Sequence, residues 1–135
     1  MRIAAFVAGD ANIFFPAVVA LTSMEKHNPG VFDFFISFPS RGLTKRMREI
    51  MSHYGIVFIP SEFLAKDTGL SSLPTMAEGN WPEEIFLNWV FPDKLSQLGY
   101  EYSVKVDYDI LCIAPYKDFD KLLPKEGILS ALTFK

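Results

Sequence analysis

Residues 102–113 read Tyr-Ser-Val-Lys-Val-Asp-Tyr-Asp-Ile-Leu-Cys-Ile, an alternating strand pattern that runs directly into two acidic residues. Val104 and Val106 would point to one face of this strand, and polar residues to the other. Asp107 and Asp109 follow at its carboxyl end, separated by one residue. Ligands of open α/β sheets bind outside such carboxyl ends, and paired carboxylates suit Mg²⁺ or Mn²⁺ shared with substrate phosphates. The stretch therefore predicts a metal site that contacts a phosphate-containing ligand.

The segments before this strand alternate between strand and helix patterns. The apolar run from Ile3 to Ala8 is typical of a strand buried on both faces of a parallel sheet. The other predicted elements are a helix from Pro16 to a stop at Asn28-Pro29-Gly30, a strand at 31–38, a helix from the N-cap Thr44 to Gly55, and a strand at 56–59. This order implies parallel pairing with right-handed crossovers. We therefore predict an α/β, Rossmann-like domain with a mostly parallel central sheet flanked by helices.

The second half of the chain is less regular before its last predicted elements. Residues 61–79 have no clear period, and we expect a long excursion there with at most a short helical turn. The stretch 80–83 (Asn-Trp-Pro-Glu) carries the signals of a helix start, and Pro92 is expected to kink or break that helix. Its predicted buried face consists of Ile85, Phe86, Trp89 and Val90. A short helix within 116–123 and a strand at 128–134 complete the prediction.

Composition excludes several classes of function. The chain has 135 residues, 50% of them hydrophobic, which fits one globular domain over residues 1–135. A net charge of −3 without a basic run argues against a nucleic-acid groove. No apolar run approaches the roughly 20 residues that span a bilayer. The single cysteine, Cys112, excludes an internal disulfide and is expected to be a buried thiol. We expect a soluble, cytoplasmic protein.

A second candidate site follows the first strand, where residues 9–12 read Gly-Asp-Ala-Asn. Asp10 and Asn12 would lie at the carboxyl end of this strand, and so at the same edge of the sheet as Asp107 and Asp109. The same two residues also suit a turn and a cap before the helix that contains Pro16. From the residues alone, both interpretations of this turn stay open.

Together, residues 6–12 (Phe-Val-Ala-Gly-Asp-Ala-Asn) and 104–109 (Val-Lys-Val-Asp-Tyr-Asp) resemble nucleotide-sugar glycosyltransferases of the GT-A fold. The pattern is most similar to the retaining enzymes of glycosyltransferase family 8. Residues 17–23 (Ala-Val-Val-Ala-Leu-Thr-Ser) fit the first helix of that family, and 31–36 its second strand. The chain is also similar to glycosyltransferases of large algal viruses, for which the compartment would be the host cytoplasm. The resemblance covers the nucleotide half of such an enzyme, so we expect the donor half of a longer glycosyltransferase.

The resemblance implies a function and a set of contacts. The activity would be metal-dependent transfer of a hexose from a UDP-sugar, of the UDP-glucose or UDP-galactose type, to a glycan or glycoprotein acceptor with retention of configuration. No catalytic residue is assigned. The implied contacts are Asp109 as a direct ligand of Mn²⁺ or Mg²⁺, Asp107 at the ribose or sugar and the metal, Asp10 at the base, Asn12 near the ribose, and the backbones of Ala8 and Gly9 lining the base pocket.

Three alternatives remain open beside this interpretation. A nucleotide-sugar-binding module would hold the donor without turnover. A nucleotidyltransferase would use paired acids for two metal ions, but residues 9–12 lack the cations that such enzymes usually carry after the first strand. A structural α/β domain would bind no ligand. One departure from the family pattern is that Asn88 and Trp89 stand where the family usually has a Tyr and an Arg.

Overall fold

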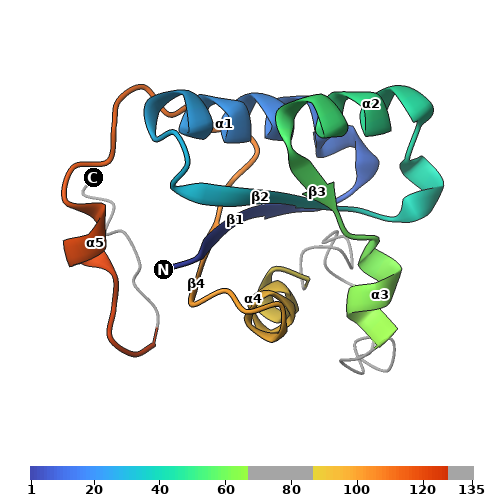
Figure 1. Cartoon of the computed structure of the whole chain (residues 1–135). Helices are drawn as coiled ribbons and strands as arrows, with labels where there is room; N and C mark the ends of the chain where they lie inside the picture. The colour runs from blue at the N-terminus through green and yellow to red at the C-terminus, as the bar shows by residue number, and fades with distance from the viewer. Residues whose placement is uncertain (67–86, 128–135) are drawn as a thin grey trace, which may run out of the picture.

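The computed structural model describes residues 1–66 and 87–127, which form an α/β fold around a parallel sheet (Figure 1). The strands of the described chain are β1 (Ile3–Ala8), β2 (Phe32–Ser37), β3 (Ile56–Phe58) and β4 (Tyr102–Lys105). The helices are α1 (Phe14–His27), α2 (Lys45–Tyr54), α3 (Ser61–Lys66), α4 (Leu87–Gln97) and α5 (Phe119–Leu122), with 3-10 turns η1 (Ala11–Ile13) and η2 (Ser40–Gly42). In this part of the chain the sheet has four strands in the order β3-β2-β1-β4, every pair parallel. The predicted Rossmann-like arrangement is thus confirmed at the level of an α/β, all-parallel sheet.

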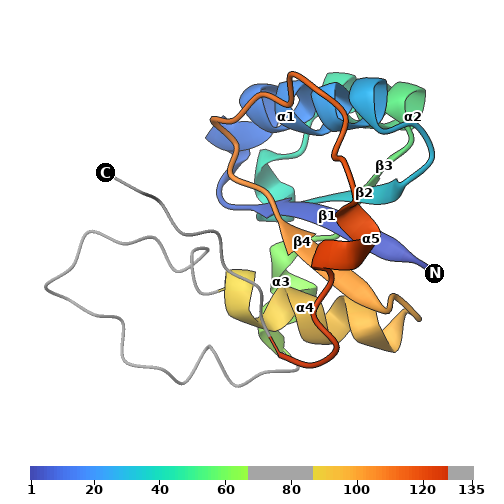
Figure 2. The ribbon, with the colours of Figure 1, turned by 90° about the vertical axis from the view of Figure 1, so that its left-hand side faces the viewer.

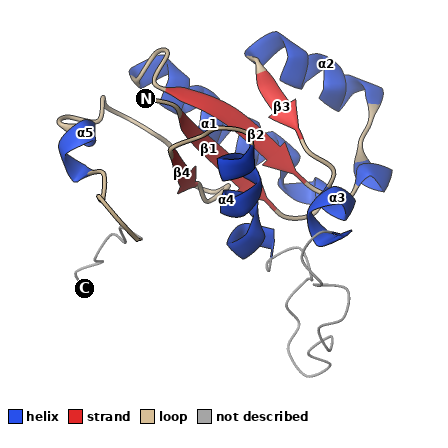
Figure 3. Cartoon of the chain, turned by 60° about the horizontal axis from the view of Figure 1, so that its bottom comes forward, coloured by secondary structure: helices blue, strands red, loops and turns tan. Residues whose placement is uncertain are grey.

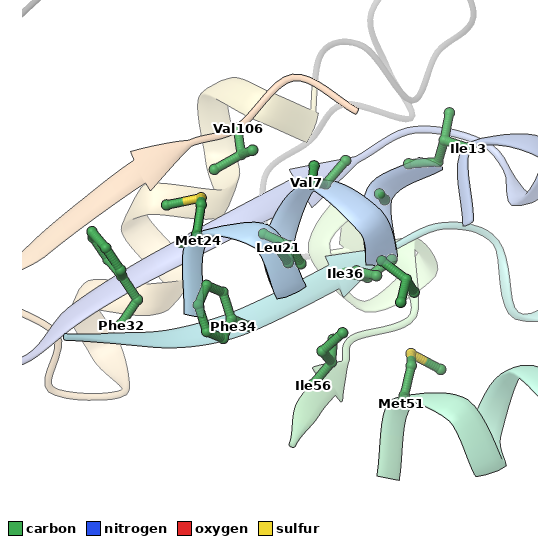
Figure 4. Packing of buried hydrophobic residues seen from close by; sticks show 14 of the residues in the cluster. Val7, Ile13, Leu21, Met24, Phe32, Phe34, Ile36, Met51, Ile56 and Val106 are labelled. Carbon is green, nitrogen blue, oxygen red and sulfur yellow. The ribbon is translucent and has the colours of Figure 1, made fainter. Parts of the chain in front are cut away.

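Helices cover both faces of the sheet and make three layers. Helices α1 and α2 lie over one face, and α3 and α4 over the other (Figures 1 and 3). Figure 4 shows the core on the α1 and α2 side, where β1 and β2 contribute Val7 and Ile36 and α1 contributes Leu21 and Met24. Among the described residues, the buried core on the opposite side contains Ala4, Phe6, Phe35, Leu64, Leu87, Phe91 and Leu95.

Strand β1 lies in the interior of the sheet, and this position explains its apolar sequence. It pairs with β2 in the register Ile3↔Phe32 and with β4 in the register Ile3↔Tyr102. Residues 3–7 are all buried, because alternate side chains enter the two cores. The prediction of a strand buried on both faces is confirmed, with the predicted bounds.

Local signals set the ends of α2 as predicted. Thr44 Oγ1 accepts a hydrogen bond from the Met47 amide at 3.2 Å, which satisfies one of the free donors of the first turn. Gly55 adopts φ +67° at the carboxyl end, a left-handed conformation that glycine enters without a steric cost. After Gly55 the chain enters β3, which pairs in parallel with β2.

Helix α4 departs from the predicted buried face at Trp89, whereas Val90 is partly buried against the core as predicted. Trp89, expected to be buried, is 76% exposed, whereas Leu87, Phe91 and Leu95 are buried. The spacing of four between these three residues places them on one side of the helix, and Trp89 falls outside that stripe. Pro92 lies inside α4 without ending it, since the helix continues to Gln97.

Other predicted elements are present in shorter form or lie outside the described residues. The helix expected within 116–123 is α5, and the short turn expected after residue 61 is α3. The predicted helix start at 80–83, the side chains of Ile85 and Phe86, most of the excursion at 61–79 and the strand at 128–134 fall outside the described residues. Within 1–66 and 87–127, none of the helices combines the length and apolar character that a membrane span requires.

Candidate functional site

The strand order defines a switch point between β1 and β4. From β1 the chain moves outward through β2 to β3, and then returns to place β4 on the other side of β1. In open α/β sheets, ligands bind outside the carboxyl ends of the strands where the order reverses in this way. Phe6 of β1 lies beside Lys105 of β4, so residues 9–12 and 107–109 leave the sheet at the same edge from adjacent strands. The topology thus brings together the two turns that the sequence singled out.

The turn after β1 is organised by Asp10. Ala8 is the last residue of β1, and the Gly9 amide donates a hydrogen bond to the carbonyl of Ser37 on β2 at 3.1 Å. Asp10 Oδ1 accepts from the Asn12 amide at 2.8 Å and so caps η1. The interpretation of Asp10 as a turn and cap residue is therefore correct for one of its carboxylate oxygens. Asp10 is half-buried, and Asn12 is exposed.

The loop after β2 packs directly against the turn after β1. A Cβ atom on Gly42 would lie 2.4 Å from the Cβ of Ala11, a separation that non-bonded carbon atoms do not tolerate. Glycine at position 42 therefore lets η2 approach η1 closely. The loop after β2 thus lies directly beside the turn after β1.

Gly42→Ala is expected to lower the free energy of unfolding by about 1–3 kcal/mol, because the new methyl group overlaps that of Ala11. Urea unfolding measures the change. The double variant Gly42→Ala with Ala11→Gly removes the opposing methyl and should recover most of the loss. A single variant as stable as the wild type would show that the two turns are not in close contact.

Helix α3 is attached to the same loop by a carboxylate. Glu62 accepts hydrogen bonds from the Ser40 amide, at 2.8 Å, and from the Ser40 hydroxyl. Burial alone would raise the pKa of Glu62, but these hydrogen bonds and the nearby charge of Arg41 outweigh it and lower the pKa below its ordinary value of 4.5. The ionised form of Glu62 is thus the form that holds α3 to the loop after β2.

This lowered pKa predicts a pH dependence. A carboxyl whose pKa is lower in the folded state stabilises the fold above its unfolded pKa, and loses that contribution as the pH falls through the folded pKa. The urea midpoint of the wild type should therefore fall more between about pH 6 and about pH 3 than that of Glu62→Gln. Glu49→Gln removes an exposed carboxylate on α2 as a control. Parallel profiles for the wild type and Glu62→Gln would contradict the role of this carboxylate.

The turn after β4 carries the two acidic residues of the predicted metal site. The Val106 amide donates to the Phe6 carbonyl at 2.8 Å, which extends the pairing of β1 and β4 by one residue. Asp107 Oδ1 forms an ion pair with Lys105 Nζ at 2.8 Å, and both side chains are more than half exposed. Asp109 lies two residues further on, in an exposed turn. Both carboxylates are accessible to a ligand at this edge of the sheet.

This donor set fits a metal ion that is shared with a ligand. In the described parts of the chain, no group of three or more His, Cys, Asp or Glu side chains is gathered closely enough to hold an ion. Mg²⁺ and similar ions are commonly bound through one or two carboxylates, with substrate phosphates and water in the other positions. Asp107 and Asp109 could supply the protein ligands of such an ion.

Lys105 is a residue of the candidate site that the sequence interpretation did not assign. It neutralises one oxygen of Asp107 and places a positive charge beside the carboxylate. The signal was present in the sequence, because residues two apart in a strand point to the same face. A strand extended as far as Asp107 would therefore place the side chains of Lys105 and Asp107 next to each other.

No protein-family model, curated protein or solved structure matches the chain.

Proposed function

We propose that this chain is the donor-binding domain of a metal-dependent glycosyltransferase that moves a hexose from a UDP-sugar to a glycan or glycoprotein acceptor. The observation that carries the proposal is the strand order β3-β2-β1-β4, which puts the Asp10 turn and the Asp107–Asp109 turn on adjacent strands at the switch point. Their shared edge is where a nucleotide would be expected in such a sheet. The resemblance of these two turns to glycosyltransferase family 8 supplies the class of ligand.

Each turn has a proposed part in holding the donor. The backbones of Ala8 and Gly9 would line the base, with the Asp10 carboxylate hydrogen-bonded to it and Asn12 near the ribose. One oxygen of Asp10 is already fixed by the Asn12 amide, which orients the carboxylate before a ligand arrives. This orientation favours binding, because less conformational freedom is lost when the base is bound.

The turn after β4 would bind the diphosphate side of the donor. Asp109, with Asp107, would hold Mn²⁺ or Mg²⁺. A bound metal ion would offset the negative charge that develops on the leaving diphosphate. Lys105 holds Asp107 in place through their ion pair and adds a positive charge near the phosphates. No residue is assigned as a catalytic base, and we propose a retaining outcome on the resemblance alone.

Release of UDP from UDP-glucose or UDP-galactose, with Mn²⁺ and with or without an oligosaccharide acceptor, tests the proposal. A sample with EDTA in place of Mn²⁺ and the variant Asp109→Asn are the controls. We expect UDP release that requires both the metal ion and Asp109. Release that persists with EDTA and in Asp109→Asn would contradict a site at this turn.

Two further assays, of UDP-sugar binding and of pyrophosphate release, separate the alternative functions. Binding of the UDP-sugar without release of UDP would indicate a binding module. Pyrophosphate release from UTP and a sugar 1-phosphate would indicate a nucleotidyltransferase. Absence of both binding and release would overturn the proposed function and leave a structural α/β domain.

A further inference from the structure

The segment that follows β4 is attached to two other parts of the chain. At its start, the Val106 amide donates to the carbonyl oxygen of Phe6 on β1 at 2.8 Å. Further on, the Cys112 amide donates to Ser23 Oγ on α1, also at 2.8 Å. Figure 2 shows this segment in orange, leaving β4 and passing over α1. Residues 107–111 lie between the two attachments, are all exposed, and contain both carboxylates of the candidate site.

The second attachment is a polar cluster at the carboxyl-terminal end of α1, where Asn28 is the C-cap residue. Asn28, which is 6% exposed, accepts from the Tyr116 amide through Oδ1 at 2.7 Å and donates to the Cys112 thiol through Nδ2 at 3.6 Å. Cys112 is buried, whereas its neighbours Leu111 and Ile113 are exposed. The segment is therefore held at residues 112 and 116 by hydrogen bonds, and at residue 112 also by burial of the thiol.

We propose that Ser23 and Asn28 are positioning residues for the metal-binding turn, which act by holding the carboxyl-terminal end of the loop 107–111 against α1. A short loop fixed at both ends has fewer conformations to lose when it binds a ligand. A ligand that requires one of these conformations binds more tightly as the population of that conformation rises. The proposal rests on the proposed function for the identity of the ligand, whereas the attachment of the loop is a property of the chain itself.

Helix α1 offers a matched pair of variants to test this. Ser23→Ala removes the oxygen that accepts from the Cys112 amide. Thr22→Ala removes the adjacent hydroxyl, whose hydrogen bonds to Val18 and Val19 stay within α1. Ser23→Thr keeps a hydroxyl at position 23. Asn28→Ala removes the acceptor of the Tyr116 amide, together with the Nδ2 hydrogen bonds to the Cys112 thiol and to the Met24 carbonyl.

The first readout is the ¹⁵N relaxation of the amides of residues 107–111 in the protein without ligand. We expect order parameters of about 0.85 in the wild type, Thr22→Ala and Ser23→Thr. In Ser23→Ala and Asn28→Ala the order parameters should fall below about 0.6. The second readout is the Kd for Mn²⁺ in the presence of UDP, from electron paramagnetic resonance titration. This Kd should rise by about fivefold in Ser23→Ala and stay unchanged in Thr22→Ala.

A loop that is mobile in the wild type, or that stays rigid in both Ser23→Ala and Asn28→Ala, would overturn the positioning role. Equal effects of Ser23→Ala and Thr22→Ala would also overturn it, because they would reflect a weakened helix rather than the attachment. A wild type that binds no Mn²⁺ would instead overturn the proposed function. The relaxation data would still decide whether α1 holds the loop, so the two failures are distinguishable.

Discussion

Asp109→Asn is expected to abolish the metal-dependent part of UDP binding while leaving the fold intact. Asparagine has nearly the same shape as aspartate, but it lacks the negative charge that makes a carboxylate a good ligand of Mn²⁺. Since Asp109 lies in an exposed turn, the substitution should change the free energy of unfolding by no more than about 0.5 kcal/mol. UDP at 100 times its Kd adds about 2.7 kcal/mol to the stability of the protein that binds it. Calorimetric titration of the protein with UDP, in the presence of Mn²⁺, would measure the loss of binding.

Asp120→Asn on α5 is the matched control, because it removes one exposed carboxylate outside the candidate site. It should bind UDP and Mn²⁺ as the wild type does. Asp107→Asn should also weaken binding, and its loss of the Lys105 ion pair should cost only about 0–1 kcal/mol of stability. UDP binding by Asp109→Asn that still depends fully on Mn²⁺ would show that the ion is held elsewhere.

Phe91→Ala is expected to lower the free energy of unfolding by about 3–5 kcal/mol, a large part of the total stability of a domain of this size. The Phe91 side chain is fully buried and stacks on the ring of Phe6, with centroids 4.6 Å apart and an interplanar angle of 8°. It also meets the ring of Phe35 edge-on at 6.4 Å. Its removal would leave a cavity between α4 and the sheet. Urea or guanidinium unfolding would measure the change.

Trp89→Ala provides the control on the same helix. Trp89 is 76% exposed, so its removal should change stability by no more than about 0.5 kcal/mol. Equal losses for the two variants would contradict the packing of α4. They would instead favour the buried position that the sequence pattern predicted for Trp89.

Strands and caps were predictable because their determinants are local. The apolar run Ile3–Ala8 gave β1 its bounds, and Thr44 and Gly55 marked the ends of α2. The buried face of α4 was not predictable in the same way, because Trp89 and Phe91 are both large apolar residues on one helix. The neighbouring ring of Phe6, which is distant in sequence, decides which of them is buried.

The candidate site was predictable only in part. Both acidic turns could be found from the sequence, since polar residues directly after apolar strands are a local signal. That they share an edge on adjacent strands depends on the position of β4 beside β1, which the strand order defines. The hydrogen bond from the Cys112 amide to Ser23 joins residues 89 positions apart, and no local pattern encodes it.

The proposed UDP-sugar site is tested most directly by the melting temperature of the wild type with UDP, GDP or buffer, each with and without Mn²⁺. We predict a rise of several degrees with UDP at about 100 times its Kd, present with Mn²⁺ and absent without it. A shift with GDP alone would contradict the choice of nucleotide. The absence of a shift with either nucleotide in Mn²⁺ would contradict the site itself.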